Sequence, residues 1–291
     1  MGMGSTLETE KTMTMKKWVA GGAVALGLMA APVHAEGLKV AADVGYAPHV
    51  MAAATGGVEG YNVDLMAEIA KRMGAEYEVI DQEWSGIFAG LAAGKYIAII
   101  APTTVTEERA NSMLFGEPYF DVNYQFLIPA GADQVKTLDD LKGKTIAVNK
   151  GNFFDKWLSE RQAEYGWEIT RFGKNADAIQ AVATGRADAN MAGDTVAGWT
   201  AQKNPLVKPS ELIISTGRVA AFAFAAGDEE NRAKFEGVVE CMIKDGTIAK
   251  IHEKWVGQPP VEGGAAYTVA AGIGAPGMPG YLPDADSGAS C

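Results

Sequence analysis

Short apolar runs alternate with longer amphipathic stretches along most of the chain, and this alternation constrains the fold more than any other feature. Leu38 to Asp43, Ile97 to Ala101 and Thr145 to Val148 have the length and composition of buried strands. Between them, Asn62 to Met73 places its apolar residues on one helical face, with Asn62 as the expected N-cap and Gly74 as the stop. Strands that alternate with helices predict an α/β protein.

The same rhythm restarts near Leu138, and no Pro/Gly/Ser-rich linker separates the two series. This continuity predicts two lobes joined by extended strands rather than domains on a flexible tether. After Trp255 the periodicity ends, and residues 257–291 are rich in Gly, Ala and Pro. Such a segment buries too little apolar surface to offset its ordering entropy, so we expect it to be disordered.

Composition excludes several classes of protein. The 291 residues are 48% apolar and 21% charged, which argues against wholesale disorder and against a multi-span membrane protein. A net charge of −11 without a basic run argues against nucleic acid as a partner. Three histidines and two cysteines leave little material for a metal site or a disulfide framework. We expect no metal and no cofactor, and we expect Cys241 and Cys291 to be free, with Cys241 in a core.

The N-terminal segment has the features of an export signal. Lys16 and Lys17 precede an apolar stretch, Trp18 to Ala31, and small residues lead to a cleavage site after Ala35. The apolar stretch is shorter than the roughly 20 residues that span a bilayer, although an uncleaved anchor is the alternative. We therefore expect residues 1–35 to be a signal peptide and the remainder to be periplasmic.

Eight segments occur in an order and spacing that resemble the family 3 periplasmic solute-binding proteins, the amino-acid receptors of ABC importers. The resemblance covers about residues 38–256, and it implies a two-lobed, type II periplasmic-binding fold: each lobe is a sheet flanked by helices, and two hinge strands join them. The segments are Asp43–Pro48, Gly60–Met66, Trp84–Ile87, Thr104–Ala110, Phe115–Tyr119, Leu141–Lys144, Thr184–Ala189 and Asp245–Trp255.

The resemblance also implies a division of the chain. Residues 36–122 would form the first part of lobe 1, residues 123–217 lobe 2, and residues 218–256 the return to lobe 1. The signal peptide (1–35) and the disordered tail (257–291) would flank them. The ligand would be clamped between the lobes.

Three positions match the family's contacts to the amino acid's backbone. Arg109 would bind the carboxylate, because its planar fork of donors matches the two oxygens. Thr104 would assist at the same carboxylate. Asp194 would bind the ammonium group, although as an isolated residue it is also a favoured cap for a helix beginning at Thr195. Because Arg109 and Asp194 belong to different lobes, one zwitterion would draw the lobes together.

The side-chain pocket is implied by Asp43, Tyr46 and Trp84, an acid with aromatic walls. Two positions depart from the family. His49 stands near a usual phenylalanine and would either read the ligand's side chain or be incidental. Phe153 follows Gly151 and Asn152, where the family usually has Ser or Thr, and it would either wall the cleft or merely pack.

The expected function is a non-enzymatic, monomeric receptor that binds a free, polar amino acid and delivers it to an inner-membrane ABC permease. Two alternatives stay open. One is an exported enzyme similar to cyclohexadienyl dehydratase on the same scaffold, which would need a general acid at the leaving group. The other is a sensory ligand-binding domain that acts on a membrane partner in trans.

Overall fold

The computed structural model describes residues 37–289 and 291. The expected signal peptide lies outside these residues. Among the helices that the structure describes, none has the length and apolar character needed to cross a membrane.

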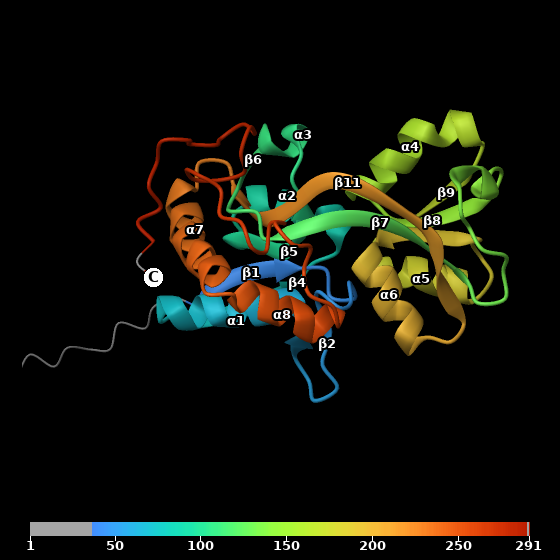
Figure 1. The fold of residues 1–291 in the computed structure, drawn as a ribbon, viewed down its shortest axis with the longest axis horizontal. Coiled ribbons are helices and arrows are strands. Elements are labelled where there is room, and N and C mark those ends of the chain that lie inside the picture. The colour runs from blue at the N-terminus through green and yellow to red at the C-terminus, as the bar shows by residue number, and fades with distance from the viewer. Residues whose placement is uncertain (1–36, 290) are drawn as a thin grey trace, which may run out of the picture. The chain divides into compact units, whose positions relative to one another are not determined.

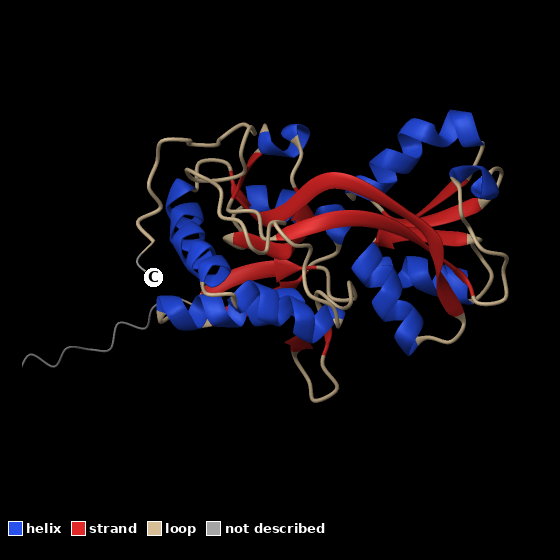
Figure 2. Ribbon diagram, viewed as in Figure 1, coloured by secondary structure: helices blue, strands red, loops and turns tan. Residues whose placement is uncertain are grey.

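A mixed sheet forms the centre of the described chain (Figures 1 and 2). Nine strands pair in the order β4-β1-β5-β11-β7-β10-β8-β9, with β6 also on β11, and β2 pairs with β3 separately. The strands are β1 (Leu38–Ala42), β2 (Met51–Ala52), β3 (Val58–Glu59), β4 (Tyr77–Asp81), β5 (Ala98–Thr104), β6 (Met113–Phe115), β7 (Phe120–Pro129), β8 (Thr145–Asn149), β9 (Glu168–Phe172), β10 (Ala189–Gly193) and β11 (Val207–Ala225).

Helices flank both halves of the sheet, with α1, α7 and α8 beside one half and α4, α5 and α6 beside the other (Figure 1). A short 3-10 helix (Leu138–Leu141) precedes β8. The α-helices are α1 (Tyr61–Met73), α2 (Trp84–Ala92), α3 (Glu107–Ala110), α4 (Phe153–Tyr165), α5 (Asn175–Ala183), α6 (Asp194–Lys203), α7 (Glu229–Lys244) and α8 (Thr247–Val256).

Two long strands join the two halves. β1 pairs in parallel with β4 and β5 in one half, and β8 pairs in parallel with β9 and β10 in the other. β7 and β11 run antiparallel to each other through both halves, so they are the hinge strands of a two-lobed α/β protein, as predicted. Their register shifts between Ser215 and Arg218. The expected lobe boundaries after residues 122 and 217 lie beside this irregularity.

Helix α1 begins differently from the prediction. Its N-cap is Gly60 rather than Asn62, and Asn62 is buried inside the first turn. Gly60 has a φ of 140°, and a Cβ there would lie 2.3 Å from the carbonyl oxygen of His49. This close approach lets the first amides of α1 donate to the preceding loop, from Tyr61 to Pro48 at 2.8 Å and from Asn62 to His49 at 3.0 Å. The helix N-terminus therefore fixes the loop that carries His49.

The C-terminal tail packs on lobe 1 as an irregular chain, so the prediction of disorder is wrong for residues 257–289. Ala265, Ala266, Ile273 and Ala275 are buried. Three tail amides donate to carboxylates of lobe 1, and the tail carbonyl of Gly280 accepts from the buried Arg232 at 2.6 Å. The amide donors and their acceptors are Ala265 to Asp121 at 3.1 Å, Ala270 to Glu117 at 2.7 Å and Gly274 to Glu236 at 2.5 Å.

Both cysteines are paired, which corrects the prediction that they are free. Cys241 on α7 forms a disulfide with Cys291, across a sequence separation of 50 residues.

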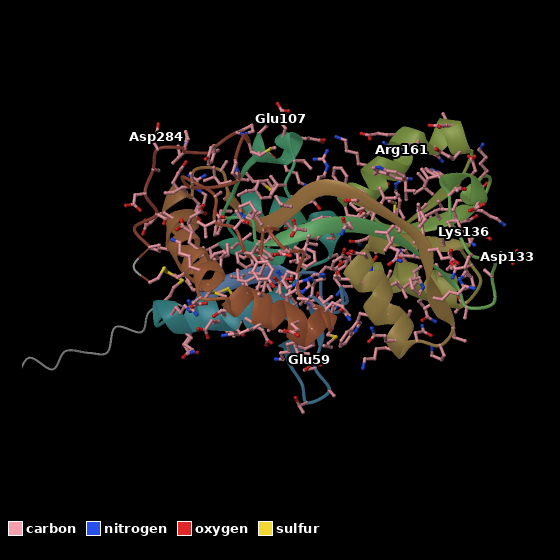
Figure 3. All side chains as sticks on the ribbon, viewed as in Figure 1. Glu59, Glu107, Asp133, Lys136, Arg161 and Asp284 are labelled. Carbon is pink, nitrogen blue, oxygen red and sulfur yellow. A yellow bond between two sulfur atoms is a disulfide. The ribbon has the colours of Figure 1, made fainter. Side chains whose placement is uncertain are left out.

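Figure 3 shows labelled charged side chains such as Glu107, Arg161 and Asp284 pointing out from the ribbon. Glu117, Glu236 and Arg232 are exceptions to this distribution, because the tail covers them.

Candidate ligand-binding site

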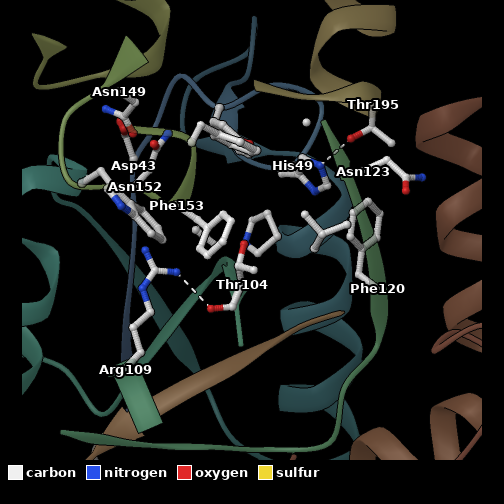
Figure 4. A pocket seen from close by; sticks show the side chains of 17 residues that line it. Asp43, His49, Thr104, Arg109, Phe120, Asn123, Asn149, Asn152, Phe153 and Thr195 are labelled. Carbon is white, nitrogen blue, oxygen red and sulfur yellow. Dashed lines mark hydrogen bonds between the residues drawn. The ribbon is translucent and has the colours of Figure 1, made fainter. Parts of the chain in front are cut away.

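One cavity lies where strands end and helices begin in both lobes (Figure 4). Asp43 follows β1, Thr104 ends β5, and Asn149 ends β8, so the parallel strands point their carboxyl ends at this place, as is typical of α/β binding sites. The residues that line it are Asp43, Tyr46, His49, Trp84, Ala101, Pro102, Thr104, Arg109, Phe120, Val122, Asn123, Asn149, Asn152, Phe153, Phe154, Gly193 and Thr195.

Arg109 presents a partly buried guanidinium to this cavity. Thr106 caps the short helix α3 by accepting from the Arg109 amide, and Nη1 of Arg109 donates to the Thr104 carbonyl at 3.0 Å. The guanidinium lies 5.0 Å from the Phe88 ring centroid. No carboxylate of the described chain forms an ion pair with it, since the adjacent Glu108 pairs with Lys156. Burial lowers the pKa of Arg109 to about 10, so the side chain is still charged at neutral pH. A charged guanidinium without an ion-pair partner in the described chain favours binding of an anion.

Asp43 supplies the opposite charge in the same cavity. Its side chain is 1% exposed, and neither carboxylate oxygen has a hydrogen-bond partner among the described residues. Burial raises the pKa of Asp43 to about 7, against the lowering effect of Lys174. The indole nitrogen of Trp84 in the same cavity also lacks a partner. Buried polar groups are almost always hydrogen-bonded, so these atoms indicate a place for a ligand's donor and acceptor groups.

Phe153 and Asn152 explain how the departures from the family's residues are accommodated. Asn152 is the N-cap of α4, and its side chain accepts from the Asp155 amide at 2.8 Å. Phe153 lines the cavity and also packs on Tyr124, with ring centroids 5.6 Å apart. It therefore both forms part of the cleft wall and packs within lobe 2. Tyr46 lines the same cavity and stacks on His49 at 5.6 Å.

Asp194 is not brought to this cavity. It is the first residue of α6, where its carboxylate accepts from the Thr195 amide and from the Asn123 side chain at 3.1 Å. The N-cap of α6 is Gly193, so Asp194 does not hold the cap position considered for it. The side chain instead borders an adjoining cavity of about 330 Å³, which Trp199 and Trp255 also line. Burial raises the pKa of Asp194.

Several contacts join the lobes around the cavity. Nε2 of His49 lies 3.0 Å from Oγ1 of Thr195, and Lys156 and Lys174 form ion pairs with Glu108 and Asp81. The enclosed cavity measures about 40 Å³. A single water needs roughly 10–15 Å³ of such space, so an amino acid enters only when the lobes or the lining side chains move apart.

Sequence reasoning missed Asn123, Asn149, Phe120 and Thr195 as lining residues. Asn149 and Thr195 carry a usable signal, because each lies at the end of a strand or the start of a helix next to a predicted site residue. No signal marked Asn123 and Phe120, which lie on the hinge strand β7, because its residue range was not predicted. Among the residues that the structure describes, no three His, Cys, Asp or Glu side chains gather in a way that suits a metal ion.

Comparison with known proteins identifies the family. Residues 38–258 match the family model of bacterial extracellular solute-binding proteins, family 3. The chain belongs to this family. The match of this solute-binding protein ends at residue 258, so almost the whole tail lies outside the part shared with the family.

Related proteins of the family bind amino acids. The L-arginine-binding protein of Pseudomonas aeruginosa is 26% identical over 250 residues, covering 83% of this chain and 96% of that protein. The solved structure of an ancestral arginine-binding protein bound to arginine is 31% identical, with a TM-score of 0.71, and covers 75% of this chain and 97% of the other. The ancestral amino-acid-binding protein AncCDT-1, a precursor of cyclohexadienyl dehydratase, is 31% identical, with a TM-score of 0.69 and coverage of 75% and 95%. This family 3 protein therefore shares its family and its fold with amino-acid-binding proteins.

Proposed function

We propose that this binding protein captures a free amino acid whose side chain is positively charged, and that it does so without chemical conversion. Arg109 and Thr104 bind the carboxylate, while Asp43, Tyr46 and Trp84 receive the side chain. The cavity wall is completed by Phe153 and His49.

The observation that carries this proposal is the presence of two unpaired opposite charges in one buried cavity. Among the residues that the structure describes, Arg109 forms no ion pair and the carboxylate oxygens of Asp43 have no hydrogen-bond partner, although burial desolvates both groups. A ligand with one anionic and one cationic end compensates both burial costs at once. Relatives that bind arginine support this choice.

We further propose that the protein is periplasmic after cleavage at Ala35, acts as a monomer, and passes its amino acid to an inner-membrane permease. The Cys241–Cys291 disulfide supports an oxidising compartment. Asp194 completes the site from lobe 2 by exchanging its hydrogen bond from Asn123 for one from the ligand's ammonium group.

A thermal-shift screen tests this function. The protein is unfolded without reductant and refolded, which removes any bound solute and keeps the disulfide. L-arginine, L-lysine and L-histidine are compared with agmatine, which is arginine without its carboxylate, and with 5-guanidinopentanoate, which is arginine without its ammonium group. A ligand at about 100 times its Kd adds roughly 2.7 kcal/mol of stability, so a binding amino acid raises the Tm clearly.

The two arginine analogues separate the anchors. No shift with agmatine is expected, because Arg109 then has no anion to bind. A shift with 5-guanidinopentanoate equal to that with arginine contradicts the role of Asp194. Silence from every amino acid contradicts the proposed function.

Binding of a cationic side chain is expected to weaken as the pH falls. Asp43 must be ionised to pair with the ligand, and its pKa in the free protein is about 7. Protons then compete with the ligand below this pKa, at about tenfold in Kd for each pH unit. The affinity measured by calorimetry should be roughly 100-fold lower at pH 5 than at pH 8. Asp43→Asn should bind weakly at both values, and an equally steep pH profile in that variant rules out Asp43 as the titrating group.

An enzymatic function is the second candidate, and the similarity to the dehydratase precursor is the observation that favours it. A carboxyl group with a pKa of about 7 beside an arginine also suits a general acid. Prephenate and arogenate are therefore incubated with the protein and followed by absorbance and mass spectrometry. If the protein forms a product and Asp43→Asn abolishes this activity, the protein is an enzyme and the proposed receptor function is wrong.

A further inference from the structure

The protonation of His49 is assigned by its hydrogen-bond network. Nδ1 of His49 lies 3.0 Å from Oδ1 of Asn62, and Nδ2 of Asn62 lies 2.6 Å from both the Ile100 carbonyl and the Tyr119 hydroxyl. A flipped Asn62 amide would set two carbonyl oxygens against each other at 2.6 Å. The amide oxygen therefore faces His49, and Nδ1 of His49 carries the ring proton.

Nε2 of His49 is then an acceptor with a bare lone pair. The Thr195 hydroxyl, 3.0 Å away at the start of α6, donates to it across the two lobes. The imidazole is 1% exposed and is surrounded by the rings of Tyr46, Tyr61 and Phe120, with centroids 5.1 to 5.7 Å away. Burial lowers the pKa of His49 to about 4, so the ring is neutral at physiological pH.

The other polar contacts between the lobes include two ion pairs at the surface and a 3.5 Å bond from Lys174 to the Val44 carbonyl. Lys156 and Glu108 have 51% and 68% of their side chains exposed, and Asp81 has 51% exposed where it pairs with Lys174. Exposed pairs of this kind contribute little, because water and salt screen them. The bond between His49 and Thr195 is partly buried, and the His49 ring itself is buried, so its loss leaves a buried ring nitrogen without a partner.

We infer that His49 is a closure latch: its Nε2, held in the acceptor form by Asn62, binds the Thr195 hydroxyl and thereby fixes the N-terminus of α6 against lobe 1. This inference rests on the proposed function, since closure is what retains the amino acid. Both ring nitrogens are engaged within the protein, so His49 neither reads the ligand nor sits in the loop incidentally. His49 is a positioning residue that acts through Thr195.

Stopped-flow kinetics with L-arginine test the latch in the full chain. Thr195→Val keeps the shape of the side chain and removes the donor. A contact between the closed lobes slows dissociation, so the variant should release L-arginine about five- to 100-fold faster, with the larger part of the affinity loss in the dissociation rate. Thr200→Val, on the same helix and outside both cavities, is the matched control and should change neither the association rate nor the dissociation rate.

Non-additive effects of the two substitutions on dissociation would show that His49 and Thr195 act as a pair. His49→Phe should have the same effect on dissociation as Thr195→Val, and the double variant should be no worse than either single variant. Additive effects, or unchanged dissociation in Thr195→Val, overturn the latch and leave binding at Arg109 unaffected.

Imidazole ¹⁵N NMR provides a readout that needs no ligand. The chain has three histidines, and His49→Phe assigns the signal. The Nδ1–H tautomer is expected at His49 in the ligand-free protein, and the Nε2–H tautomer overturns the latch. If the wild type binds neither L-arginine nor another amino acid, the proposed function fails, and the tautomer still decides the latch.

Discussion

Replacing Arg109 with alanine should abolish capture of the amino acid while leaving the fold intact. The guanidinium is the unpaired cation of the cavity, so its removal leaves the ligand's carboxylate buried without a counter-charge. Truncation of one partner of such a buried pair costs about 2–5 kcal/mol, which corresponds to a roughly 30- to 5000-fold weaker Kd. Titration calorimetry with L-arginine measures this loss.

The matched variants for this experiment separate charge from geometry. Arg109→Lys keeps the charge and loses the planar fork, so we expect it to recover only part of the affinity. Arg161→Ala removes a guanidinium that stacks on Trp157 away from the cavity and should bind normally. The ligand-free Tm of Arg109→Ala should not fall, because a buried cation without a partner is removed. Wild-type affinity in Arg109→Ala would show that the ligand lies elsewhere.

Sequence reasoning predicted the parts of this protein that depend on local pattern. The strands β1 and β8 end within one residue of the predicted Leu38 to Asp43 and Thr145 to Val148, because their apolar runs and flanking residues specify them. Arg109, Thr104 and Asp43 share one cavity, as the resemblance implied, because Asp43 follows β1, Thr104 ends β5 and Arg109 lies on the helix after β5. For these strands and these three residues, the local sequence pattern and the positions of the strand ends were sufficient for the prediction.

The rest depends on contacts between distant residues. His49 and Thr195 are 146 positions apart, so no local pattern shows that they form a pair. The strand β11 is 19 residues long and crosses both lobes, and its pairing with β5 and β7 depends on residues remote in sequence. Asp194 was placed by analogy with relatives, and its hydrogen bond with Asn123 depends on the register of β7.

The tail shows why composition alone misled the prediction. Its glycines let the tail backbone approach lobe 1 closely, and they do not indicate disorder here. A Cβ at Gly264 would lie 2.2 Å from Oδ2 of Asp121. The tail has little apolar surface to bury, but its amides are satisfied by Glu117 and Glu236, which are remote in sequence. Hydrogen bonding of backbone groups thus replaces the apolar periodicity on which the sequence analysis relied.

Removing residues 258–291 should therefore destabilise the protein strongly. The deletion takes the amide donors from Glu117 and Glu236 and the carbonyl acceptor from Arg232, and it breaks the Cys241 disulfide. Each of the three lost hydrogen bonds contributes about 1 kcal/mol, and a native disulfide contributes about 2–4 kcal/mol. At roughly 2–4 °C per kcal/mol for a chain of this size, calorimetry should show a Tm at least 10 °C lower.

A matched variant separates the disulfide from the packing of the tail. Cys241→Ser with Cys291→Ser keeps every hydrogen bond of the tail, so it should lose only the contribution of the disulfide. If the truncated protein and the double serine variant melt together, the tail's hydrogen bonds contribute nothing. A truncated protein that melts like the wild type would mean that the tail is not docked at all.

The pH dependence of stability gives an independent signature of the docked tail. Burial raises the pKa of Glu117 to about 8 and that of Glu236 to about 7. Between about pH 4.5 and pH 8 the folded protein then binds more protons than the unfolded chain, so its free energy of unfolding should decrease as the pH rises through this window. In the truncated protein water reaches both carboxylates and their pKa values return toward the ordinary range. The decrease should therefore become smaller, leaving the part that comes from Asp43. Denaturant unfolding at pH 5 and pH 8 measures the difference, and an equal decrease in both proteins would mean that the tail does not bury these carboxylates.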